Sequence, residues 1–158
     1  MNVRIRRAER RDVDGMLQLV RELATFEREP DAVSVTPEHM ADAGFGPHPV
    51  WVGWVAENDG AMVGMAICYE RYSTWKGRRL YLEDIVVTSK ARGQRIGERL
   101  FRECARYAVE QGHAGMVWQV LDWNVDAIRF YERHGASMDP QWINGSLEVE
   151  QLKRLAVP

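Results

Sequence analysis

Residues 81–100 (YLEDIVVTSKARGQRIGERL) have the residue types and spacing of a phosphate-binding cradle. An apolar, β-branched run leads into a loop with Gly93 and Gly97, and a helical pattern follows. The first turn of a helix has unpaired N–H groups and a positive dipole end, which together bind anions. The spacing is neither G-x-G-x-x-G nor G-x-x-x-x-G-K-[ST], so a dinucleotide fold or nucleoside triphosphatase is not supported. The alternative is a solvated cationic helix face, because residues 90–106 hold six basic and two acidic side chains.

Two adjacent carboxylates, Glu83 and Asp84, interrupt the apolar run before this loop. In a strand, Glu83 shares a face with Tyr81, Ile85 and Val87. Desolvation of a carboxylate among apolar neighbours would suit a general base, and the alternative is a paired structural carboxylate. Asp84 is expected on the opposite face, unless a β-bulge turns both carboxylates to one side.

A few other side chains could take part in chemistry. Tyr131 lies on a helix predicted to begin at Asn124, where it is either a core aromatic or a proton donor. Trp75 lies in a glycine-containing loop, where it either packs or stacks on an aliphatic ammonium. The histidines lack metal-ligand spacing, so no metal site is expected. Cys68 and Cys104 fall in apolar patterns and are expected to be core residues.

The elements that position these residues follow from hydrophobic periodicity and turn signals. A D-G pair at residues 59–60 predicts a hairpin, and Pro30 ends the first helix. The order β-α-β-β-β-α-β-α-β predicts an α/β fold in which helices pack on a mixed sheet. The predicted strands are 3–7, 50–57, 62–72, 80–87, 116–121 and 146–152; the helices are 13–29, 97–111 and 124–133, with a loop at 30–49 that holds a turn of helix near 37–43.

Size and composition indicate one globular domain over residues 1–158. Apolar residues make up 46% and charged residues 28% of the chain, with a net charge of -2. That charge is unusual for a nucleic-acid or membrane-surface partner, so neither is expected. The sequence lacks a signal-peptide pattern and a long apolar run, so a cytoplasmic protein is predicted.

The cradle resembles motif A of the Gcn5-related N-acetyltransferases (GNAT), whose loop pattern is [QR]-x-x-G-x-[GA]. Three further segments resemble the diamine acetyltransferase subfamily, and within it the thialysine N-epsilon-acetyltransferase type. These segments are AGFGPHPVW (43–51), YSTWKGRRLYLEDIVV (72–87) and VLDWNVDAIRFYERHGA (120–136). The resemblance implies a GNAT (acyl-CoA N-acyltransferase) fold with helices on both faces of a mixed sheet. It also implies acetyl-CoA as donor substrate and a homodimer with active sites near the two-fold interface.

The resemblance also implies roles for individual residues. Tyr131 matches the tyrosine that protonates the departing thiolate, and Glu83 matches the proposed general base, acting directly or through water. Glu27, Trp75 and Asp84 match positions near the amine, together with Glu83. The implied acetyl-CoA contacts are Ile85, Val86, Val87, Arg92, Gly93, Gln94, Arg95, Ile96, Gly97, Asn124 and Tyr131.

Two positions depart from the family pattern. Arg95 stands where the family has its central glycine, so a Cβ lies where the backbone approaches phosphate. We expect a tolerated conformation and a possible added guanidinium contact to phosphate, because a required positive φ would be costly. Ser73 stands where polyamine-specific members carry an acidic residue.

The sequence therefore predicts an N-acetyltransferase that acts by direct transfer in a ternary complex. The expected acceptor is a primary amine of a thialysine-, lysine- or ornithine-like amino acid. The alternatives are a diamine or polyamine N-acetyltransferase and a non-catalytic acyl-CoA-binding module. A protein or peptide acetyltransferase would need an open groove at loop 30–49.

Overall fold

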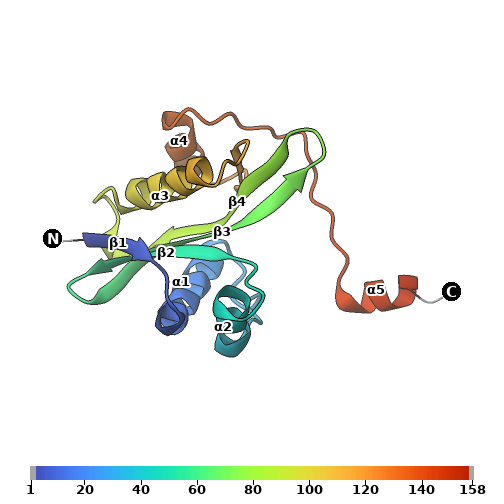
Figure 1. Ribbon diagram of the computed structural model, residues 1–158, viewed down its shortest axis with the longest axis horizontal. Coiled ribbons are helices and arrows are strands. Elements are labelled where there is room, and N and C mark those ends of the chain that lie inside the picture. Colours follow the sequence, from blue (N-terminus) through green and yellow to red (C-terminus); the bar gives the residue numbers. More distant parts are fainter. Residues whose placement is uncertain (1–2, 157–158) are drawn as a thin grey trace. The chain divides into compact units, whose positions relative to one another are not determined.

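The structure is a computed structural model that describes residues 3–156. The chain divides into two compact units, Met1–Gln119 and Val120–Pro158. The first unit contains the sheet and three α-helices, and the second contains two helices joined by an irregular segment (Figure 1).

The sheet of the first unit has five strands within the described residues, in the order β1-β2-β3-β4-β5. Neighbours pair antiparallel except β4 and β5, which pair parallel, so the sheet is mixed as predicted. The long central hairpin β3–β4 has Ser73 opposite Gly77 at its turn. The strands are β1 (Val3–Arg7), β2 (Val52–Asn58), β3 (Ala61–Ser73), β4 (Gly77–Val87) and β5 (Met116–Val117).

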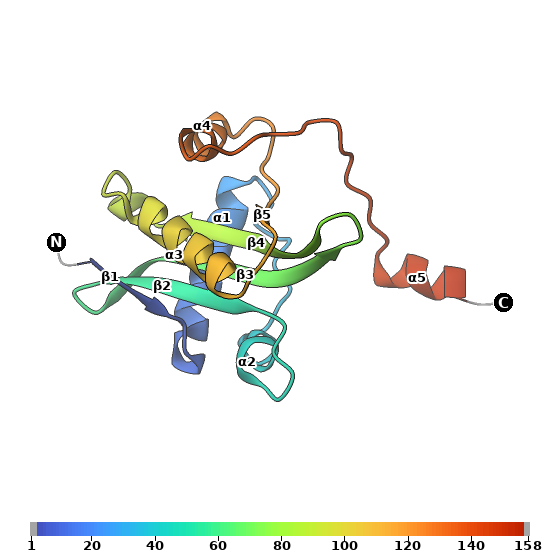
Figure 2. The same cartoon turned by 45° about the horizontal axis from the view of Figure 1, so that its top comes forward.

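Helices cover both faces of this sheet. Helices α1 (Val13–Phe26) and α2 (Pro37–Phe45) lie on one face, and α3 (Ile96–Glu110) lies on the other (Figures 1 and 2). Short 3-10 turns at Arg10–Asp12 and Ser89–Ala91 precede α1 and α3. The arrangement confirms the predicted fold class.

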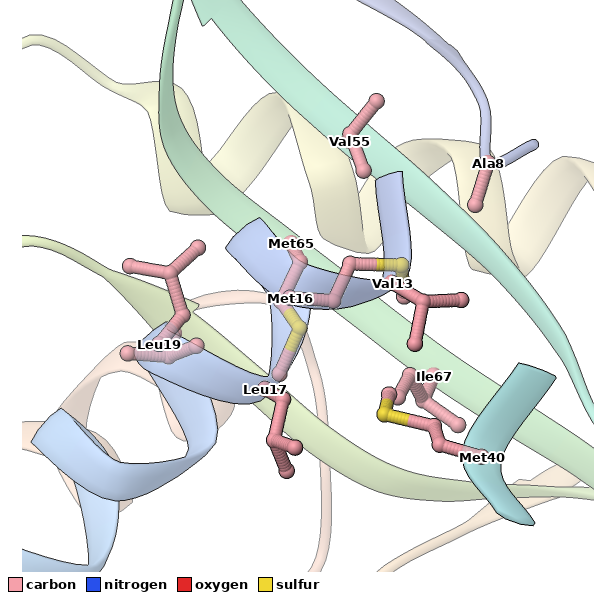
Figure 3. Close-up of a cluster of buried hydrophobic side chains, with 10 residues drawn as sticks. Ala8, Val13, Met16, Leu17, Leu19, Met40, Val55, Met65 and Ile67 are labelled. Carbon is pink, nitrogen blue, oxygen red and sulfur yellow. The ribbon is translucent and has the colours of Figure 1, made fainter. Parts of the chain in front are cut away.

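The face under α1 forms the main hydrophobic cluster (Figure 3). Met16 and Leu17 of α1 are fully buried against Val55, Met65 and Ile67 of the sheet, because the apolar residues of α1 recur at helical spacing. Because Met65 and Ile67 of β3 are buried in this cluster, the side chains that share their face of β3 and β4 point toward α1.

The opposite face packs against α3. Leu100 of α3 approaches Gly64 of β3 so closely that its Cδ1 lies 3.3 Å from the position of an added Cβ. Cys104 of α3 and Cys68 of β3 are free, buried thiols, and burial beside Cys104 raises the pKa of Cys68. The two cysteines are core residues, as predicted.

Asp12 occupies the N-cap position of α1, but its side chain makes no capping hydrogen bond to that helix. Its carboxylate instead accepts from Arg6 Nη1 at 2.6 Å and from the backbone N–H of Glu9 at 2.7 Å. The Arg6 hydrogen bond holds the pKa of Asp12 below its usual range. This buried ion pair ties β1 to the start of α1.

The second unit contains α4 (Val125–Arg133) and α5 (Val149–Ala156). Asn124 caps α4 as predicted, because its Oδ1 accepts from the N–H of Ala127 at 3.3 Å. The strand predicted at 146–152 is wrong, since α5 occupies most of that segment. Val149, Leu152 and Leu155 recur at steps of three, a spacing that fits a helix.

The strand predicted at 116–121 is also shorter than expected, because β5 ends at Val117. As a result, β5 pairs with β4 only at Leu80 and Tyr81. Across residues 3–156, no helix has the length and apolarity needed to cross a membrane.

Candidate active site

The predicted cradle is the loop between β4 and α3. Gly93 adopts a left-handed conformation at φ 80°, which a glycine takes without strain. The first backbone hydrogen bond of α3 runs from Arg99 N to Arg95 O at 3.1 Å. The N–H groups of Ile96 and Gly97 precede that bond and are therefore without intrahelical acceptors. An anion could bind to these donors and to the positive end of the helix dipole.

Arg95 departs from the tolerated conformation that we expected. It precedes α3 with φ 57° and ψ 20°, in the left-handed region. That conformation costs an L-residue roughly 1–2 kcal/mol because its Cβ crowds the following carbonyl. A glycine would adopt this conformation without that cost, so Arg95 holds the loop's path at the expense of local strain.

Arg92 opens the loop and folds back onto the first unit. Its Nε donates to Val87 O at 3.2 Å, and its guanidinium lies 5.4 Å from the ring centroid of Phe26. Gln94 lies half-buried between Gly93 and Arg95. The loop is thus anchored at its start by a side chain and at its end by α3.

The end of β4 has a free edge. Ile85, Val86 and Val87 pair with β3 on one side, opposite Ala66, Met65 and Gly64. On the other side β5 has already ended, so within residues 3–156 no strand pairs with this edge. Its backbone groups could bind an extended ligand as an added strand would.

A β-bulge in β4 brings Glu83 and Asp84 to the same face. Asp84 pairs with Ile67 and Leu82 pairs with Cys68, so Glu83 is the extra residue. Ile67 packs in the cluster under α1, which places Asp84 on that face too. Tyr69 shares the face of Ile67 by alternation, and its hydroxyl lies near enough to Glu83 for that carboxylate to raise the pKa of the phenol. The bulge thus produces the arrangement that simple alternation excluded.

Asp84 is the more desolvated of the two carboxylates. It is half-buried whereas Glu83 is exposed, so the desolvation expected at Glu83 falls on its neighbour. Burial, followed by the negative charges of Glu83 and Glu27, raises the pKa of Asp84 to about 6. A carboxyl group with this pKa is mostly ionised at neutral pH and still a useful proton acceptor.

Glu27 completes a group of three carboxylates on this face, here called the acidic cluster (Glu27, Glu83 and Asp84). It is the residue after α1, where its backbone N–H still donates to Leu23 O. Burial raises the pKa of Glu27. The charges of Glu27 and Glu83 disfavour the ionisation of Asp84, so the acidic cluster would attract a cation.

Tyr69 and Tyr81 were not predicted as site residues, and they line the acidic cluster. Their rings stack at 5.0 Å between centroids, because the two residues are cross-strand partners. Burial, followed by the charge of Glu83, raises the pKa of Tyr69 to about 12. The signal was present in the hairpin: counting outward from Ser73 and Gly77 places the two tyrosines opposite each other.

Trp75 lies away from the acidic cluster. It is in the β3–β4 turn and 86% exposed, while Glu83 and Asp84 are near the other end of β4. Ser73 Oγ shapes the turn by accepting from the N–H groups of Trp75 and Lys76 at 3.3 and 3.2 Å.

The second unit contains Asn124 and Tyr131. The side chain of Asn124 is engaged in capping α4. Tyr131 is buried on α4, and the adjacent ring of Phe130 lies 5.3 Å from its own. Their predicted roles at the thioester remain predictions.

A cavity of about 190 Å³ lies elsewhere in the first unit, by the start of β2 and the C-terminal end of α3. Its polar lining is only partly paired, because both ring nitrogens of His113 are buried without a hydrogen-bond partner among the described residues. Glu70 accepts from Arg78 Nε at 2.7 Å, and His113 Nε2 lies 3.3 Å from the same carboxylate, outside hydrogen-bond geometry. Glu70 pairs with Leu80 and shares the face of Cys68, so its ion pair with Arg78 lies on the opposite face of the sheet from the acidic cluster.

Comparison with known proteins gives a consistent result. The model of the acetyltransferase (GNAT) family matches residues 15–136. The pig protein thialysine N-epsilon-acetyltransferase is 36% identical over 98% of both chains. The human spermidine/spermine N(1)-acetyltransferase-like protein 1 is 35% identical over 84% of this chain and 20% of its own length. An integron cassette protein from the V. cholerae mobile metagenome has the same fold, with a TM-score of 0.79 and 24% identity over 99% and 98% of the two chains. The free edge of β4, the cradle before α3 and these likenesses together show that the chain belongs to the acetyltransferase (GNAT) family.

Proposed function

We propose that this protein transfers acetyl from acetyl-CoA to a primary amine of a small amino acid of the thialysine, lysine or ornithine kind, by direct transfer in a ternary complex. The acidic cluster is the observation that carries the proposal, because it offers three carboxylates to an ammonium beside a strand edge and an anion cradle. The name of the pig relative supports the same substrate class.

The residues around the cradle fit acetyl-CoA. The N–H groups of Ile96 and Gly97 and the flanking loop from Arg92 to Arg95 would bind the pyrophosphate. The edge formed by Ile85, Val86 and Val87 would hold the pantetheine arm, and its amide donors would stabilise the oxyanion. When bound, acetyl-CoA supplies a thioester carbonyl that an amine can attack.

The acceptor must lose a proton before it attacks, because an ammonium has no free electron pair. The Glu83–Asp84 pair is the proposed acceptor of that proton. Asp84 has the pKa near neutrality, raised by burial and by its acidic neighbours. Glu83, exposed beside it, would hold the incoming ammonium or relay the proton through water.

Tyr131 is proposed to donate a proton to the departing thiolate, and Asn124 is proposed to contact the cofactor. A phenol is a suitable acid because the thiolate leaves as an anion and needs a hydrogen-bond donor. Tyr131→Phe removes this donor and keeps the ring, so turnover should fall at least about tenfold.

The test is a steady-state assay of CoA release with thialysine, lysine, ornithine, putrescine, spermidine and spermine. The proposal expects amino-acid amines to have the highest kcat/KM. A preference for spermidine would favour the polyamine reading, which the acidic cluster and the human relative also fit. CoA binding without turnover on any amine would leave a non-catalytic binding module.

The pH dependence of kcat/KM separates the two carboxylates. In the unaltered protein the acid limb should lie near pH 6, where Asp84 titrates. Glu83→Gln removes a repelling charge, so the limb should move to lower pH. Asp84→Asn should abolish that limb. A limb that stays at the same pH in both variants would contradict the assignment.

We also propose a single domain over residues 1–158 that forms a cytoplasmic homodimer. The pig relative matches over 98% of both chains, which supports one domain. Val149, Leu152 and Leu155 on α5 are exposed apolar side chains that a second copy could cover. Light scattering should give twice the chain mass, and Leu152→Glu with Leu155→Glu should reduce it to the monomer. A monomeric parent protein would contradict the homodimer. The proposed function needs no nucleic acid, membrane or metal ion as a partner.

A further inference from the structure

Two arginines on the central hairpin stand on the same face as the acidic cluster. Arg71 of β3 and Arg79 of β4 are cross-strand partners, one step further toward the turn than the Tyr69–Tyr81 pair. Alternate residues of a strand share a face, so Arg71 follows Tyr69 and Arg79 precedes Tyr81. From the middle of β4 toward the turn, this face therefore offers carboxylates, then phenols, then guanidiniums.

The positions of the two guanidiniums differ. Arg71 Cζ lies 5.8 Å from the ring centroid of Tyr81, and Arg71 is exposed. Its charge acts on both phenols, because it opposes the rise in the pKa of Tyr69 and of Tyr81 that burial causes. Arg71 is thus within electrostatic reach of the tyrosines that border Glu83.

Arg79 has an unsatisfied donor. Its Nε is buried and has no hydrogen-bond partner in the described part of the chain. Its guanidinium covers Gly115, since Nη2 lies 2.6 Å from the position of an added Cβ there. Directly opposed like charges destabilise a sheet, so an Arg–Arg pair with an orphan donor indicates an anion that joins them in use.

We propose that Arg71 and Arg79 bind the carboxylate of an amino-acid acceptor whose distal amine lies at the acidic cluster. This inference rests on the proposed acetyltransferase function and deepens it. It says which residues make the enzyme prefer an amino acid to a polyamine. A diamine or polyamine lacks this carboxylate but keeps a second ammonium, which two guanidiniums repel without any compensating attraction.

The spacing allows this assignment. Arg79 and Glu83 are four residues apart on β4, about 13 Å between their Cα atoms. An extended lysine-like molecule and two long side chains span that separation. Tyr69 and Tyr81 between the two ends would pack along the aliphatic part of the acceptor.

The test compares amine pairs that differ only by the carboxylate: lysine with cadaverine, and ornithine with putrescine. The unaltered protein should show a kcat/KM at least about tenfold higher for the amino acid. In the Arg71→Gln, Arg79→Gln double variant, the kcat/KM for the amino acid should fall about 10- to 100-fold. The fall should come from a higher KM, because charge-assisted hydrogen bonds to the carboxylate are lost. The value for the diamine should rise, because its second ammonium is no longer repelled.

Arg78→Gln is the matched control. Arg78 is also an arginine of this hairpin and lies next to Arg79 in the sequence, but it pairs with Glu70 on the opposite face. Its variant should therefore keep the preference for the amino acid over the diamine. Arg71→Lys with Arg79→Lys should restore part of it, because the charge returns without the bidentate geometry. Thermal unfolding would check that each variant is folded, and calorimetry with lysine and CoA would check binding apart from turnover.

The outcomes separate this inference from the proposed function. Amine acetylation with no dependence on the carboxylate, or an equal loss on both members of a pair, would overturn the role of the arginines alone. No acetylation of any amine by a CoA-binding protein would overturn both.

Discussion

The cradle before α3 and the two carboxylates that β4 contributes to the acidic cluster, Glu83 and Asp84, are adjacent in the chain but bind by different means. The cradle offers backbone N–H groups, which every residue except proline carries. The acidic cluster offers side chains whose charges depend on one another. A site built from backbone N–H groups therefore tolerates arginine in place of glycine at position 95. A site built from side chains loses its chemistry when a single atom changes, as when a carboxylate oxygen of Asp84 is replaced by nitrogen.

The largest expected effect is at Asp84. Asp84→Asn removes the proton acceptor and keeps the shape, so kcat/KM should fall about 100-fold or more. The Kd for CoA should change little, because the cradle is untouched. Glu70→Gln, on the opposite face of the sheet, is the control for loss of a hairpin carboxylate. A weaker CoA complex with normal turnover would break the distinction between the two regions.

The same substitution should stabilise the fold at neutral and higher pH. The pKa of Asp84 rises from 3.8 to about 6 on folding, so the folded state holds a proton that the unfolded state has lost between these values. Stability therefore falls as pH rises from about 4 to about 6 and is level above that. Asp84→Asn should increase the free energy of unfolding by about 3 kcal/mol at pH 8 and leave it nearly unchanged at pH 3.

Denaturant unfolding at the two pH values measures this difference. Glu29→Gln, an exposed carboxylate just after α1, is the comparison and should show little change at either pH. Equal stabilisation at both pH values would show that packing, and not ionisation, is the cause.

The smallest expected effect is in the cradle. Arg95→Gly relieves the left-handed strain and should raise the free energy of unfolding by about 1 kcal/mol. The larger conformational entropy of glycine in the unfolded chain offsets part of this gain. Arg95→Ala keeps a Cβ and should give no such gain. If both variants weaken CoA binding equally, the Arg95 guanidinium contacts phosphate. The cradle would then bind through a side chain as well as through backbone N–H groups, and would differ less from the acidic cluster.

Much of the fold was predictable because it depends on local periodicity. The apolar stripes of α1 and α3 and the turn signals of the hairpins predicted those elements within a few residues. The segment around Val149 was not, because Leu147 and Val149 alternate as in a strand while Val149, Leu152 and Leu155 recur as in a helix. An ion pair between Glu150 and Lys153, at 2.8 Å, is compatible with the helix alone.

The candidate site was predictable only in part. The cradle is a contiguous motif, so the sequence located it, but the conformation of Arg95 was not apparent from residue type. The shared face of Glu83 and Asp84 depends on where β4 gains a residue relative to β3, which is a property of strand pairing. Tyr69, Arg71 and Arg79 were missed for the same reason, since their relation to Glu83 appears only when the register is known.

The bulge at Glu83 also changes the parity of β4. Before it, odd-numbered residues such as Tyr81 face α1, and after it even-numbered residues such as Asp84 and Val86 do. A deletion of this one residue would leave the composition of the strand almost intact and yet turn every later side chain to the other side. Anyone who transplants the acceptor site to another scaffold must therefore move the irregular pairing of the two strands along with the carboxylates.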